Sequence, residues 1–176
     1  MVLESMHDEV EATLASVRKT HRDVGKALKK AYGYAVFPSV GRASAVLGAA
    51  HGRGEVFEQG ERVGIATLSQ VTAGVQVGGQ TFSELVLFNS KEALYRFKRG
   101  RIAFSANASV ALMKAGACAV SNYEKDVVTR AFSHGGMQLE LALGFQRFTY
   151  RSLEEEKLRE QTSQADEGTN GKRRAA

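Results

Sequence analysis

The chain of 176 residues is 43% hydrophobic and 24% charged, a composition that suits one globular domain with a substantial core. No apolar run approaches the roughly 20 residues that span a bilayer, and the first residues have neither the basic start nor the apolar core of a signal peptide. The formal net charge of +5 favours partners that carry negative charge. We therefore expect a cytoplasmic or peripheral membrane protein, or a periplasmic or otherwise exported one if a signal sequence has been removed.

Residues 1–30 have the pattern of an amphipathic helical segment. Their apolar side chains recur at alternating steps of three and four, the spacing of one helical face. These residues are Leu3, Met6, Val10, Leu14, Val17, His21, Val24 and Leu28. Thr20 with Asp23 resembles a capping box, which would divide the segment into two helices. The segment is expected either to pack on a β core or to lie on a membrane surface.

Positive charge is concentrated in two places. Residues 18–30 contain six bases and only Asp23 as an acid, and residues 91–101 contain five bases and only Glu92. In the first cluster the bases follow an acidic helix start, an order that the helix dipole also favours. Both clusters are candidates for contact with anionic groups.

Residues 31–150 read as a glycine-rich β region. Short apolar segments alternate with glycines, and residues 71–77 alternate strictly between apolar and small or polar side chains, as in a half-exposed strand. Glycines at the bends favour a strongly curved antiparallel sheet or a partly closed barrel. Gly52 and Gly54 do not begin a dinucleotide-binding loop, because Phe57 stands where the third glycine is required. With the N-terminal helices, this predicts an α+β fold.

One short helix is predicted inside the β region. Asn89 or Ser90 would cap it, and Gly100 would end it. Ala93, Leu94 and Phe97 would form its inward face. Residues 151–176 begin with helix-forming residues but lack an apolar face and end in a polar run, so we expect a largely disordered tail.

Five blocks of sequence, in order, resemble the SYLF domain family of lipid-binding modules, and the resemblance extends from about Lys29 to Tyr150. The blocks are KAYGYAVFP, AHGRGEVFEQG, TLSQVTAGVQVGGQTFSELVLF, KEALYRFKRGRIAFSANASVAL and AFSHGGMQLELALGFQRFTY. In this family the second block supplies a paired-glycine turn. The resemblance implies a module that binds phosphoinositides or other acidic phospholipids. The chain lacks the tryptophan usual in eukaryotic members, so it is more similar to the bacterial members.

The resemblance and the charge clusters together predict peripheral binding to an anionic phospholipid membrane surface. The expected first contacts are the bases of the helical segment, Arg18, Lys19, Arg22, Lys26, Lys29 and Lys30. The second candidates follow the predicted short helix and are Lys98, Arg99 and Arg101. Two alternatives stay open: a protein-interaction module that docks a partner through its N-terminal helix, and a carrier of a small apolar ligand in the β region.

Other classes of function lack support in the sequence. The four histidines show no metal-ligand spacing, and Cys118 has no second cysteine for a disulfide. No nucleophile elbow occurs, so we expect no enzymatic activity, no metal and no cofactor. The basic clusters contain no interleaved aromatic residues that would stack on bases, so no specific nucleic-acid binding is expected.

Overall fold

The computed structural model describes residues 2–44, 47–73, 78–100, 103–104, 110–114, 117–121, 126–133 and 144–174. Two helices come first, α1 (Val2–Thr20) and α2 (Arg22–Lys30). Four long strands follow, β1 (Gly33–Ser44), β2 (Leu47–Glu58), β3 (Glu61–Ala73) and β4 (Gly78–Phe88). Next come α3 (Lys91–Lys98), β5 (Ala103–Phe104), β6 (Val110–Lys114), β7 (Ala117–Ser121), β8 (Val127–Ser133), β9 (Gly144–Ser152) and α4 (Leu153–Arg174). The predicted α+β class is confirmed.

The strands form one sheet, in the order β5-β9-β3-β2-β1-β4-β8-β7-β6, and every pairing is antiparallel. The ladder ends at β5 on one side and at β6 on the other. Within the described residues no pairing joins these two edges, so the sheet is open, and neither the predicted strong curvature nor the predicted partial barrel is observed. The sheet nevertheless bends. The bend is indicated by the rings of Phe37 on β1 and Phe148 on β9, which lie 5.7 Å apart although two strands separate β1 from β9.

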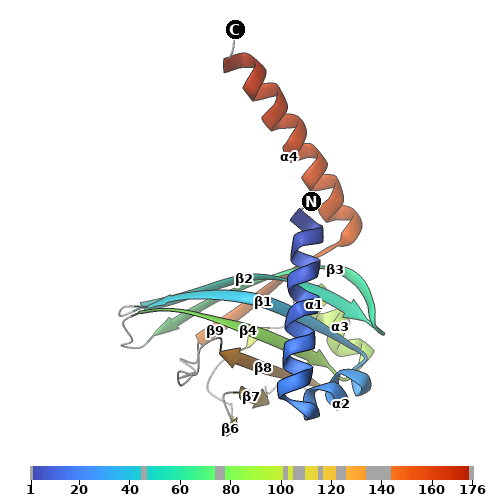
Figure 1. The fold of residues 1–176 in the computed structure, drawn as a ribbon, viewed down its shortest axis with the longest axis vertical. Coiled ribbons are helices and arrows are strands. Elements are labelled where there is room, and N and C mark those ends of the chain that lie inside the picture. The colour runs from blue at the N-terminus through green and yellow to red at the C-terminus, as the bar shows by residue number, and fades with distance from the viewer. Residues whose placement is uncertain are drawn as a thin grey trace.

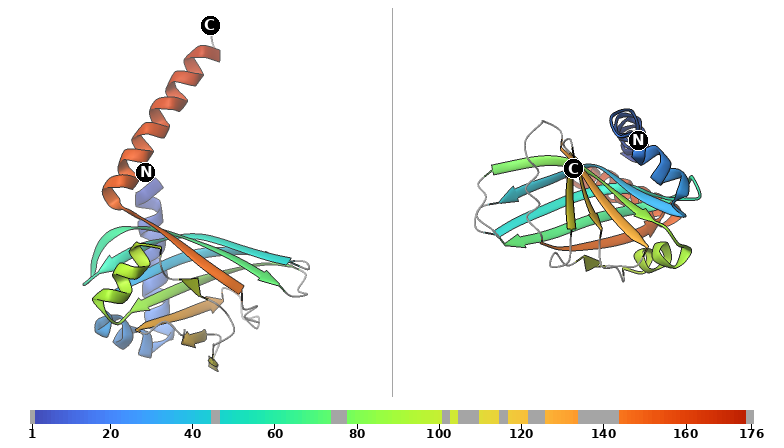
Figure 2. Two further views of the ribbon diagram at one scale, coloured as in Figure 1. Left: turned by 180° about the vertical axis from the view of Figure 1, so that it is seen from behind. Right: turned by 90° about the horizontal axis from the view of Figure 1, so that it is seen from below.

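The helices cover both faces of the sheet. Helices α1 and α2 lie on one face, where Val10, Leu14 and Val24 pack with Val36 and Leu85. Helix α3 lies on the other face, and its buried residues join the core cluster that includes the two phenylalanines of β1 and β9. Figures 1 and 2 show α1 crossing one face and α3 the opposite one. The apolar stripe predicted for the N-terminal segment is therefore used to pack that segment on the sheet.

Local patterns predicted α3 correctly. The Ser90 hydroxyl accepts a hydrogen bond from the backbone N–H of Ala93 at 3.3 Å, as expected of a helix cap. Ala93, Leu94 and Phe97 are buried. The helix is followed by Gly100 with φ +64, a left-handed conformation that favours glycine.

The C-terminal segment differs from the predicted disordered tail, because Leu153–Arg174 is helical and extends away from the sheet (Figure 1). A capping box begins this helix: Glu155 accepts from the Ser152 backbone N–H at 2.8 Å, and the Ser152 hydroxyl accepts from Glu155 N–H at 3.3 Å. Buried Glu156 accepts a hydrogen bond from Arg53 of β2 at 2.7 Å. Glu156 also pairs with Arg151 at 3.5 Å. Local capping and these two ion pairs define the helix start without an apolar face.

The glycines at positions 52 and 54 lie inside β2 and do not form the expected turn. Opposite them, the register of β1 shifts between Val36 and Ser39, around the only proline. The hydroxyl of Ser83 on β4 donates to the carbonyl of Pro38 at 2.8 Å and so satisfies one polar group of this irregularity. A Cβ at Gly54 would collide with the backbone carbonyl of Val36. Close approach of two backbones, and not a turn, requires glycine here.

We expect the substitution Gly54→Ala to lower the free energy of unfolding by about 2 kcal/mol, because the added methyl forces β1 and β2 apart. The matched control is Gly41→Ala on β1, where an added Cβ meets no atom within 4 Å. That change should be neutral or slightly stabilising. Urea denaturation of both variants measures the difference, and equal midpoints would contradict this explanation.

Candidate anion-binding groove

The basic segment is divided into two helices at His21. Helix α1 ends at Thr20 and α2 begins at Arg22, as the sequence predicted, although the N-cap of α2 is His21 and its side chain makes no capping hydrogen bond. Asp23 does not act as a capping-box partner, because it forms an ion pair with Arg130 of β8. The hydrogen bond from Arg130 holds the pKa of the Asp23 carboxyl below its ordinary value. The single acid of this segment is thus paired with the sheet.

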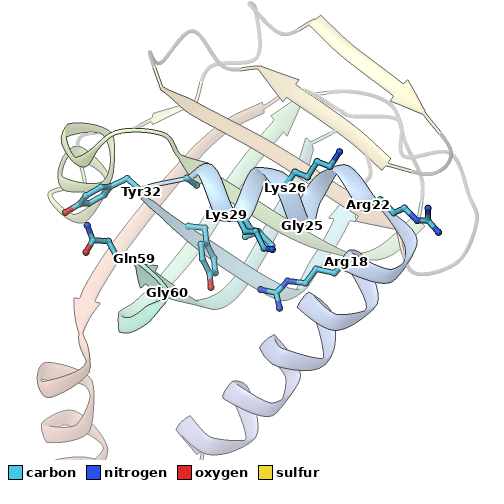
Figure 3. A pocket seen from close by; sticks show the side chains of 11 residues that line it. Arg18, Arg22, Gly25, Lys26, Lys29, Tyr32, Gln59 and Gly60 are labelled. Carbon is cyan, nitrogen blue, oxygen red and sulfur yellow. The ribbon is translucent and has the colours of Figure 1, made fainter.

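Four of the predicted bases line a single groove, whose volume is about 870 Å³ (Figure 3). They are Arg18 in the last turn of α1 and Arg22, Lys26 and Lys29 on α2. The three α2 residues are four and three positions apart, so they share one helical face. The other residues that line the groove are Gly25, Leu28, Ala31, Tyr32, Tyr34, Gln59 and Gly60.

The opposite wall is the turn between β2 and β3. Gln59 and Gly60 both have positive φ, 52° and 90°, and the backbone N–H of Gln59 donates to the carbonyl of Tyr32 at 2.9 Å. This hydrogen bond ties the turn to the chain that connects α2 with β1. The groove therefore joins residues that are 25 to 42 positions apart in sequence, from Tyr34 and Gln59 to Arg18 and Gly60. Local patterns could not have revealed its second wall.

Two tyrosines contribute aromatic surface. Tyr34 stacks on Phe57 with ring centroids 4.8 Å apart and an interplanar angle of 15°. Burial raises the pKa of the Tyr34 hydroxyl, while Arg18 opposes that rise. The Tyr32 hydroxyl donates to Glu58 at 2.9 Å, and this hydrogen bond raises its pKa. Both phenols therefore stay neutral at physiological pH and offer polar edges beside the cations.

The side chains that line the groove include four positive charges and no negative charge. No acidic residue is among those that line it, and none of its four bases makes an ion pair within the part of the chain that the structure describes. Arginine and lysine side chains are the usual ligands of phosphate and carboxylate groups. The arrangement can therefore bind an anion, and the residues suggest no other chemistry.

The remaining predicted contacts lie elsewhere. Lys19 and Lys30 are exposed but do not line the groove. The ammonium of Lys98 pairs with Glu58 at 2.6 Å and lies about 5 to 6 Å from the ring centres of Tyr95 and Tyr150, so it is already neutralised. This hydrogen bond holds the pKa of Glu58 below its ordinary value. Arg99 is exposed at the end of α3, and Arg101 lies outside the described residues.

Metal-binding clusters and membrane-spanning helices are both absent from the described residues. Among these residues, no three histidine, cysteine, aspartate or glutamate side chains are grouped so that they could hold a metal ion. No described helix has the length and hydropathy needed to cross a membrane. The groove is thus the candidate site of the described structure.

Comparison with known proteins identifies no family. No protein-family model matches the chain, and no curated protein matches it. One solved structure with a match is the crystal structure of a beta-barrel-like, uncharacterized protein from Brucella abortus, with a TM-score of 0.49 and 15% sequence identity over 81% of this chain and 94% of that one. This match carries no information on function, and the SYLF resemblance stays a prediction.

Proposed function

We propose that this protein binds anionic phospholipid surfaces peripherally and without catalysis, and that Arg18, Arg22, Lys26 and Lys29 make the principal contacts. The observation that carries this proposal is that all four line one groove and that no acidic residue lines it with them. Lys19 and Lys30 are exposed on the same two helices and would add long-range attraction. Arg99 and Arg101 stay second candidates, whereas Lys98 is the weakest of the predicted contacts because it is paired with Glu58.

The docked helices limit how the protein can attach. Val10 and Leu14 are buried against the sheet, so α1 cannot insert these side chains into lipid without leaving the core. Each base near an anionic membrane contributes about 1 kcal/mol, and four such bases together correspond to a dissociation constant of roughly 1 mM. Charge alone therefore gives weak, reversible attachment, and tighter binding requires direct contact with a headgroup.

The proposal is tested by co-sedimentation with phosphatidylglycerol and phosphatidylcholine vesicles at physiological ionic strength. We expect binding to the anionic vesicles only. The double variant Arg22→Gln/Lys26→Gln should bind about 30-fold more weakly, since two bases contribute about 2 kcal/mol. The control Lys19→Gln/Lys30→Gln removes equal charge outside the groove and should lose much less.

Three results would count against the proposal. Failure of the intact protein to bind anionic vesicles would refute lipid binding. Equal losses in the two double variants would refute the groove as the site and favour a diffuse basic surface. Complete displacement of the vesicles by an equal charge of duplex DNA would favour a nucleic-acid partner, because both partners are polyanions and salt dependence cannot distinguish them.

A further inference from the structure

Gly25 lies on the same side of α2 as its basic residues, at one edge of the face that they form. It stands three positions after Arg22 and four before Lys29, so one turn of helix separates it from each. It lines the groove together with both of them (Figure 3). The helix therefore presents backbone without a side chain beside its basic residues, on the wall of the groove.

The fold itself gives no reason for glycine at this position. Gly25 is not among the glycines with positive φ, and a Cβ built on it would meet no atom within 4 Å. By contrast, a Cβ at Gly54 or Gly64 would collide with a neighbouring backbone carbonyl. Glycine inside a helix is also one of the least favourable residues. Neither backbone conformation nor packing explains why a short helix contains it here.

The shape of the groove supplies a reason. A side chain at position 25 would project beside the cations and occupy groove space that is now open. The volume of about 870 Å³ falls in the range of small-molecule sites and exceeds by far the room that a single phosphate ion needs. Gln59 on the opposite wall offers an amide that can both donate and accept hydrogen bonds. These features fit a polar group that carries phosphate and has several further atoms.

We propose that the groove is a discrete site for one phosphate-bearing headgroup, and that Gly25 determines its specificity by letting the phosphate approach the backbone of α2. This inference rests on the proposed function and deepens it from a charged surface to a site with defined stoichiometry. A phosphate monoester carries nearly two negative charges at neutral pH and accepts several charge-assisted hydrogen bonds. The same group could belong to a membrane lipid or to a soluble phosphorylated compound.

The experiment compares vesicles that contain phosphatidic acid, a phosphate monoester, with phosphatidylglycerol vesicles of equal surface charge. We expect the intact protein to prefer phosphatidic acid by at least about tenfold. Gly25→Met keeps a good helix former but fills the groove, and it should lose this preference while retaining charge-driven binding to phosphatidylglycerol. Ser16→Met, at an exposed position of α1 that does not line the groove, is the control and should behave as the unmodified protein.

Inorganic pyrophosphate is the soluble probe, titrated by calorimetry. One-to-one binding that is lost in Gly25→Met would support the discrete site. If pyrophosphate binds in this way while no vesicle does, the site is confirmed for a soluble phosphorylated ligand and only the lipid proposal fails. If Gly25→Met retains both the preference and pyrophosphate binding, the discrete site is refuted while lipid binding by charge stands. Circular dichroism and the unfolding midpoint show that each variant is folded, and Gly25→Met should unfold at no lower temperature than the original protein.

Discussion

Replacing Glu84 by glutamine is expected to stabilise the protein by several kcal/mol above pH 8 and to leave it almost unchanged near pH 5. Glu84 is buried on the face of the sheet that carries α3, where it accepts hydrogen bonds from the Gln146 amide at 2.9 Å to each carboxyl oxygen. Burial raises its pKa from the ordinary value of 4.5 to about 8, and the hydrogen bond from Gln146 opposes part of that rise.

The direction of this pH dependence of stability follows from proton binding. Between pH 4.5 and 8 the folded protein keeps the Glu84 proton that the unfolded chain releases, so the folded state binds more protons and stability falls as pH rises. The fall is about 1.4 kcal/mol for each pH unit, or about 5 kcal/mol over the whole interval. Glutamine cannot ionise and keeps the size of the side chain, so this part of the pH dependence should disappear.

Chemical denaturation at intervals from pH 5 to pH 9 measures this effect. Glu61→Gln is the control, because Glu61 is an exposed carboxylate at the start of β3, and the stability profile of this variant should parallel that of the unmodified protein. If the Glu84→Gln profile also ran parallel to both, the buried carboxyl would be ionised in the folded state and its proposed protonation would be wrong.

The second large effect concerns Arg62. We expect Arg62→Met to lower the free energy of unfolding by on the order of 3 kcal/mol, because it removes a charged partner from the fully buried Glu55. Arg62 donates to Glu55 at 2.6 Å, and the His7 ring nitrogen Nδ1 lies 2.8 Å from the other carboxyl oxygen. With arginine removed, His7 is the remaining described partner with an ionisable side chain.

A double variant separates two contributions to this loss of stability: the loss of the Arg62–Glu55 ion pair itself, and the cost of leaving the buried Glu55 carboxylate without its arginine partner. Glu55→Leu/Arg62→Met should recover most of the lost stability, since replacing a buried ion pair by apolar residues is often neutral or stabilising. Asp23→Asn is the control for an exposed pair, because Asp23 pairs with Arg130 near the surface, and this change should cost less than about 1 kcal/mol. Guanidinium denaturation would contradict this account if Arg62→Met cost no more than Asp23→Asn, or if the double variant were as unstable as the single one.

Patterns of a few residues predicted the three helices α1, α2 and α3 well, but not the length of α4. The break between α1 and α2 and the cap and buried face of α3 each depend on residues within one or two turns of one another. The amphipathic spacing of residues 1–30 also predicted which side chains would be buried. It did not decide whether they would pack on a β core or lie on a membrane surface. The structure places that stripe on the sheet.

Features that join distant residues could not be predicted. Lys98 was a candidate contact because it belongs to a basic run, yet it is paired with Glu58, which is 40 residues away. Glu55 alternates with apolar neighbours in a way that suggests a solvent-facing strand position, but α1 covers that face and brings His7 to it. Gly25 did leave a local signal, since an isolated glycine in a helical pattern calls for a reason. The reason lies in the groove, which exists only in three dimensions.

The two walls of the groove come from residues 18–34 and from the turn at Gln59 and Gly60, so the groove forms only while the N-terminal helices remain docked on the sheet. Any compound that occupies it must therefore shift the folding equilibrium by mass action, by about 2.7 kcal/mol when its concentration is 100 times its dissociation constant. Thermal unfolding can thus serve as a screen of phosphorylated compounds that requires neither an assay of activity nor a ligand identified beforehand. A compound that raises the unfolding temperature of the original protein but not of Gly25→Met would be one that the groove itself selects.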